Sequence, residues 1–164
     1  MGDSIISGLV SKLNMLPDEV VTLILAMLPI SELRGAIPFG IHNNMPLARL
    51  LAISILGNLL PVIPLYFLLG RIMRLLDKSR AGRGFSLWLV SRTLKKSGVI
   101  QLYEMAGLII FVGIPLPMTG AWTGTVAAVL LKLRPKYYFI GITGGVLLAA
   151  AIVSVLMLLI KIAI

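Results

Sequence analysis

Residues 32–40 read ELRGAIPFG and follow the apolar run VVTLILAMLPI of residues 20–30, with only Ser31 between them. A helix of that run's length reaches about 16 Å, which is about half of a hydrocarbon core roughly 30 Å thick. Glu32 and Arg34 therefore come directly after a segment that is too short to cross a bilayer. This order predicts a helical hairpin that turns inside the membrane and carries a carboxylate and a guanidinium at its tip.

The composition is that of a membrane protein. Of 164 residues, 59% are hydrophobic and 13% are charged, and the mean hydropathy is +1.03. Residues 50–69, 105–131 and 137–160 contain no Asp, Glu, Lys or Arg, and a spanning helix needs roughly 20 such residues. The sequence therefore predicts an all-α integral membrane protein, a single multi-pass domain in the cell membrane.

Positive charge gathers in one connection of the chain. Residues 71–96 hold Arg71, Arg74, Lys78, Arg80, Arg83, Arg92, Lys95 and Lys96 against one acid, Asp77. The positive-inside rule places this loop in the cytoplasm, where anionic lipid headgroups would attract it. Residues 85–96, FSLWLVSRTLKK, have the pattern of an amphipathic interfacial helix. We expect membrane lipids as partners and no nucleic acid, because no soluble module presents the charge.

The basic residues also constrain the number of crossings. If residues 20–41, 46–70, 105–131 and 137–160 all crossed, Lys132, Arg134 and Lys136 would face the side opposite the basic loop, against the orientation rule. If residues 105–131 instead turn at Pro115-Leu116-Pro117 and return, both clusters are cytoplasmic. A single proline-kinked span over 105–131 is the alternative, because membrane helices tolerate proline kinks.

The resulting order is an inverted repeat of a re-entrant hairpin followed by a transmembrane helix. Gly35-Ala36 recurs 85 residues later as Gly120-Ala121, and inverted repeats are the plan of many secondary transporters. The predicted segments are an interfacial helix (1–17), a first re-entrant hairpin (18–45), a transmembrane helix (46–70), a basic cytoplasmic loop with the amphipathic helix (71–102), a second re-entrant hairpin (103–132) and a second transmembrane helix (133–164).

The two hairpin tips are the candidate binding site for substrate and ion, since ionisable groups at membrane depth are functional by default. Arg34 offers a planar fork to a phosphate or carboxylate. Gly35 and Gly120 are expected to leave backbone N–H groups available to an anion at the starts of the return helices. Desolvation would favour protonated Glu32 and Arg34 would favour the ionised form, so proton coupling is a hypothesis. The candidate residues are Glu32, Arg34, Gly35, Pro38, Asn58, Pro115, Pro117, Thr119, Gly120, Trp122 and Thr123.

Several of these residues have a simpler interpretation. Glu32 could begin a helix at the headgroup level, Thr119 and Thr123 could satisfy local backbone groups, and Asn58 could join helices. Tyr137 and Tyr138 beside Lys136 are interpreted as part of an interfacial aromatic belt.

Catalytic and metal sites are not expected. The chain has no cysteine and one histidine, which argues against a metal site or a cofactor. Glu32 has no second acid or histidine at its depth, so we expect no enzyme and no catalytic residue.

ELRGAIPFG at 32–40, together with IPLPMTGAWTG at 114–124, resembles the paired signatures of the small multidrug export family. That family is itself similar to the DedA superfamily, whose members have two opposed re-entrant hairpins. DedA-like proteins are implicated in moving lipid carriers such as undecaprenyl phosphate, using acidic and arginine residues at the hairpins. Glu32 and Arg34 match that chemistry, whereas no arginine lies between Lys96 and Lys132.

The resemblance implies a secondary transporter, proton- or ion-coupled, that moves an amphiphilic substrate, either drug-like or a phosphate-bearing lipid, through the site between the hairpins. Two alternatives stay open: a flippase or scramblase for polyprenyl-phosphate-type lipids without ion coupling, and a non-transporting membrane scaffold protein. With two predicted full spans the monomer encloses little volume, so a homo-oligomer is expected.

Overall fold

The computed structural model describes residues 16–76, 104–116 and 119–163. Most of the predicted interfacial helix and basic loop, and Pro117, lie outside these residues. Every element in the described ranges is an α-helix, as the sequence predicts, and no strand occurs in them. The helices are α2 (Asp18–Met27), α3 (Glu32–His42), α4 (Leu47–Leu76), α7 (Glu104–Gly113), α8 (Ala121–Leu130) and α9 (Pro135–Ala163).

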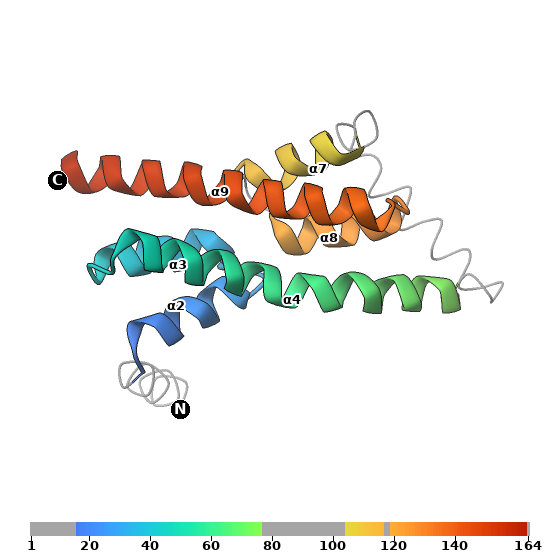
Figure 1. The fold of residues 1–164 in the computed structure, drawn as a ribbon, viewed down its shortest axis with the longest axis horizontal. Coiled ribbons are helices and arrows are strands. Elements are labelled where there is room, and N and C mark those ends of the chain that lie inside the picture. The colour runs from blue at the N-terminus through green and yellow to red at the C-terminus, as the bar shows by residue number, and fades with distance from the viewer. Residues whose placement is uncertain (1–15, 77–103, 117–118, 164) are drawn as a thin grey trace, which may run out of the picture.

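Helices α4 and α9 are long enough to cross a membrane. They have 30 and 29 residues, about 45 and 43 Å of helix, against a hydrocarbon core of roughly 30 Å. Large apolar side chains such as Leu56, Phe67, Leu147 and Leu159 are exposed on them, as lipid-facing residues would be. The two helices lie side by side and run in opposite directions (Figure 1).

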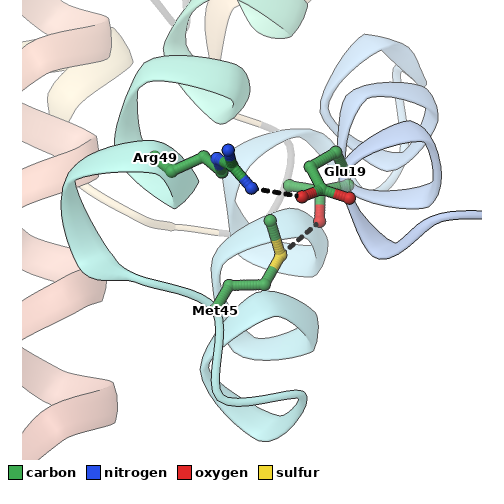
Figure 2. A network of polar contacts seen from close by, with 4 residues as sticks. Glu19, Met45 and Arg49 are labelled. Atoms are coloured by element: carbon green, nitrogen blue, oxygen red, sulfur yellow. Dashed lines mark hydrogen bonds and ion pairs between the residues drawn. The ribbon is translucent and has the colours of Figure 1, made fainter.

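The first pair of short helices, α2 and α3, forms a hairpin. Asn43 Nδ2 donates a 2.8 Å hydrogen bond to Asp18 Oδ1, which joins the start of α2 to the end of α3. Figure 2 shows the contacts of the same end with the next helix, where Glu19 of α2 pairs with Arg49 of α4 at 2.8 Å. These polar contacts fix the open end of the hairpin against the beginning of α4.

The second pair, α7 and α8, folds back in the same way. A Cβ atom added to Gly124 would meet the side chains of Val112 and Leu108, which in a single helix would lie far along the axis. The structure therefore excludes one continuous helix over residues 105–131. Gly141 and Gly145 let α7 approach α9 closely, since a Cβ atom at either position would lie 3.0 Å or less from Leu108 or Val112 atoms.

The two halves repeat the same elements. Helices α2, α3 and α4 have 10, 11 and 30 residues, and α7, α8 and α9 have 10, 10 and 29. The hairpins lie toward opposite ends of the α4–α9 pair, and their tips meet between them (Figure 1). The fold thus brings the turn between α2 and α3 against the turn between α7 and α8.

Tyr138 departs from its interpretation as an interfacial belt residue. Its side chain is fully buried, and its hydroxyl donates to Val62 O at 2.9 Å and lies 3.1 Å from Thr125 Oγ1. Its ring stacks on Tyr66 with centroids 4.0 Å apart. The position next to Lys136 suggested a surface, but the turn of α9 that carries Tyr138 faces α4 and α8, so the ring becomes part of the core.

Candidate functional site

Glu32 and Arg34 lie in the first turn of a helix and not in a non-helical tip. The turn of the first hairpin is Leu28–Ser31, and α3 begins at Glu32. Ser31 Oγ donates a 2.6 Å hydrogen bond to Leu25 O, which ties this turn to the last turn of α2. Glu32 has a φ of +46°, which is uncommon for a residue with a side chain. Backbone strain of this kind concentrates at functional sites.

The Glu32 carboxylate binds the start of a helix in the other hairpin. Its two oxygens accept hydrogen bonds from the backbone N–H groups of Ala121, at 3.3 Å, and Trp122, at 3.1 Å. These groups are unpaired within α8, and the positive end of the helix dipole favours the anion. The side chain is only 8% exposed, so these bonds form away from bulk water.

Gly120 makes this contact possible. Its φ is +139° and its ψ is −174°, a region that is essentially restricted to glycine. A Cβ atom at this position would overlap Glu32 Oε2. The sequence predicts that Gly120 leaves N–H groups available to an anion, and here the anion on the neighbouring N–H groups of Ala121 and Trp122 is a side chain of the same chain.

Arg34 binds backbone carbonyl groups, whereas Glu32 binds backbone N–H groups. Its Nη1 donates to Leu116 O at 2.6 Å, and its Nη2 donates to Thr119 O at 3.0 Å and to Thr119 Oγ1 at 2.9 Å. Thr119 Oγ1 also contacts Ile114 O at 2.9 Å. The guanidinium thus donates hydrogen bonds to three oxygen atoms of the turn between α7 and α8.

The two charged side chains therefore join the hairpins as a pair. Glu32 takes the N–H groups and Arg34 takes the carbonyl groups of the same opposing turn, so each charge meets partial charges of opposite sign. Trp122 Nε1 adds a 3.2 Å bond to Met27 O in the reverse direction. We call the contacts of Glu32, Arg34 and Trp122 the tip latch.

Asn58 lies at the edge of this latch. Its side chain is fully buried and close enough to the Glu32 carboxylate to interact with it. Within the described part of the chain, neither its Oδ1 nor its Nδ2 atom has a hydrogen bond of good geometry.

The remaining predicted residues have more local surroundings. The N–H of Gly35 donates to Ser31 O at 2.9 Å, so it is not available to an external anion as the sequence suggested. Thr123 is exposed, and its hydroxyl bonds to Gly120 O at 3.3 Å. Pro38 lies within α3 and Pro115 within the second turn, both half-buried.

Two cavities adjoin these elements. The first, of about 290 Å³, lies at the latch and is lined by Pro29, Ile30, Glu32, Arg34, Thr119 and Thr123. The second, of about 490 Å³, lies between α4, α8 and the start of α9, with Tyr66, Phe67, Leu130, Arg74 and Lys132 among its lining residues. Sequence reasoning missed the second cavity because its lining residues come from two segments that are distant in the chain, 66–74 and 129–135.

Neither Arg49 nor Arg134 adds a second arginine to the latch. Arg49 pairs with Glu19 at the open end of the first hairpin, and Arg134 lies at the start of α9, beyond the far end of α8. Groups of three or more His, Cys, Asp or Glu suited to a metal ion do not occur among the residues described.

A family model described as "Putative small multi-drug export protein" matches residues 32–152. The match begins at Glu32, directly after the first turn, and includes the whole turn between α7 and α8. The chain belongs to the small multi-drug export family. No curated protein and no solved structure matches the chain significantly.

This family assignment and the two long apolar helices identify the chain as a membrane protein, and the family description is that of a transporter. In this small multi-drug export protein, the matched region contains every residue of the latch except Met27.

Proposed function

We propose that this small multi-drug export protein is an ion-coupled secondary transporter whose two hairpins enter the membrane from opposite sides, in a DedA-like inverted repeat. Three features support the proposal: the matching lengths of the two halves, the opposite directions of α4 and α9, and hairpins that point toward each other (Figure 1). The basic loop would be cytoplasmic, so the α3–α4 turn would face outward.

The observation that carries the proposal is the Glu32 carboxylate on the N–H groups of Ala121 and Trp122. An anionic group of a substrate would compete for the same N–H groups. Protonation of Glu32 would remove the charge that holds the carboxylate there. Either event weakens the latch, so substrate and proton act on one contact, which is the requirement for coupling.

The second cavity supports an amphiphilic substrate with a phosphate or carboxylate. Its walls include Tyr66, Phe67 and Leu130, which suit an acyl or prenyl chain, and Arg74 and Lys132, which suit an anionic headgroup. A substrate of this class would have to move along α8 from this cavity, which Val129 and Leu130 line, to the N–H groups of Ala121 and Trp122 at the other end of that helix.

Transport by purified protein in proteoliposomes tests the proposal. The probes are a fluorescent short-chain prenyl phosphate and ethidium, each with and without a pH gradient. We expect Glu32→Gln and Arg34→Ala to abolish gradient-driven movement, while Arg49→Ala retains it because Arg49 lies in a surface ion pair. Wild-type rates from both latch variants would reject the proposal.

The same experiment decides the second candidate, a lipid scramblase without ion coupling, which the apolar and basic lining of the second cavity favours. Equal movement of the prenyl phosphate in both directions, unaffected by the pH gradient, would select the scramblase. If no probe moves and the latch variants support normal growth in cells, the third candidate, a membrane scaffold protein, is selected.

A further inference from the structure

A row of buried polar groups without partners extends from the latch along α4. Asn58 and Ser54 are both fully buried, and Ser54 Oγ, like the amide of Asn58, has no hydrogen-bond partner among the described residues. A buried polar atom without a hydrogen-bond partner is unfavourable, so such atoms are rare unless something occupies the space beside them.

The spacing of the row suits water. Residues 54 and 58 are one helical step of four apart, so they share a face of α4 and lie about 6 Å apart along the axis. Two hydrogen bonds of about 2.8 Å span that distance through one bridging water molecule. Glu32, Asn58 and Ser54 together offer several polar atoms, and a buried water needs two to four partners.

The packing of α3 on α4 shows which end of the bundle the row of Asn58 and Ser54 leads to. A Cβ atom on Gly40 would overlap the Leu50 side chain, so the α3–α4 turn lies at the Leu50 end of α4. Going from Asn58 to Ser54 therefore leads away from the latch and toward that turn. Leu50 is the next residue on the same face, and it is fully buried and apolar.

We propose that Asn58 and Ser54 hold internal water that carries protons between the Glu32 carboxylate and the end of the bundle at the α3–α4 turn, with Leu50 closing the path in this conformation. The inference rests on the proposed coupling role of Glu32. A proton taken from water at that end moves along the hydrogen-bonded row and binds a carboxylate oxygen, and it leaves by the reverse route.

Among the described groups around Glu32, those that could pass a proton to it come from α4. Arg34 of the same helix is the charged residue whose field acts on Glu32 in the described part of the chain, and a guanidinium does not release its proton. Helix α8 presents backbone N–H groups to it. From α4 comes Asn58, which both donates and accepts hydrogen bonds.

The rate at which Glu32 is protonated after a rapid fall in pH tests the proposal independently of transport. Infrared difference spectra of the purified full-length protein report the carboxyl band, and Glu32→Gln identifies it in a chain with six acidic residues. We expect Asn58→Leu and Ser54→Ala each to slow protonation about tenfold or more. Leu50→Ser, which extends the row by one turn, should speed it.

Ser154→Ala is the matched control, because Ser154 is also a buried serine without a partner in the described ranges but lies on α9. It should leave the rate unchanged. Ser54→Ala should not lower the melting temperature, because its hydroxyl bonds to no described protein group, whereas Asn58→Leu also removes the contact with Glu32. Wild-type protonation rates in both α4 variants, or equal slowing by Ser154→Ala, would overturn the proposal. Ser54→Ala keeps the test decisive even if Asn58→Leu does not fold.

Rapid, Asn58-dependent protonation in a protein that transports none of the probes would refute the proposed function and leave the proton path intact. Conversely, wild-type protonation rates in both α4 variants, in a protein whose gradient-driven transport is abolished by Glu32→Gln, would refute the proton path and leave the proposed function intact.

Discussion

Gly120→Ala tests the latch most directly, because the added methyl group both strains the backbone at residue 120 and displaces the Glu32 carboxylate. The residue has a φ of +139°, and an alanine there would cost about 1–3 kcal/mol in backbone strain. The new Cβ atom would also overlap Glu32 Oε2 and displace the carboxylate from two N–H groups, at about 1.5–3 kcal/mol for each bond to a charged group.

Even the lower ends of these ranges together exceed about 3 kcal/mol. For a chain of this length that corresponds to a fall in melting temperature of at least about 6 °C. The assay is thermal unfolding of the detergent-solubilised protein, followed by circular dichroism. Gly70→Ala is the control, because a Cβ atom at Gly70 meets no atom within 4 Å and alanine is favoured over glycine in a helix.

A double-mutant cycle separates the backbone strain at residue 120 from the clash with Glu32. In a Glu32→Ala background the clash is absent, so Gly120→Ala should cost only the backbone strain of about 1–3 kcal/mol. If Gly120→Ala melts at the same temperature as Gly70→Ala, or costs as much in the Glu32→Ala background as in the wild type, the contact between the tips is not as described.

Two further substitutions test the packing around the site. Tyr138→Phe removes the bond to Val62 O and should lower the free energy of unfolding by about 1–3 kcal/mol. Tyr137→Phe, at a half-buried neighbour, should have a smaller effect in the same melting assay. Equal effects would contradict the buried assignment of Tyr138. Arg49→Ala should cost less than about 1 kcal/mol, because Arg49 and Glu19 are 62% and 40% exposed; a larger loss, or one unaffected by salt, would show that the pair is not a surface contact.

The sequence predicts the helices of this fold well because their signals are local. The charge-free runs place two long apolar helices at 46–70 and 133–164, and the structure has them at Leu47–Leu76 and Pro135–Ala163. The break at Pro115 is also local, since proline disfavours a continuing helix. In each case the residues that determine the element lie within it.

The partners of the site residues were not predictable in the same way. Glu32 and Ala121 are 89 positions apart, and no periodicity links a carboxylate in one hairpin to the free N–H groups of another. The sequence therefore suggested that these N–H groups await an external anion. Tyr138 illustrates the same limit, because its neighbour Lys136 indicates a surface while the contacts that bury it come from α4 and α8.

The near-equal halves of the chain differ at the latch, where their hairpin tips meet. The first half contributes charged side chains and the second contributes backbone dipoles, so exchanging the conformations of the two halves cannot recreate the same set of bonds. Under the proposed transport mechanism, two forms related by such an exchange would differ in free energy even with nothing bound. The proposed transporter would therefore rest preferentially in one of the two forms in the absence of an ion gradient.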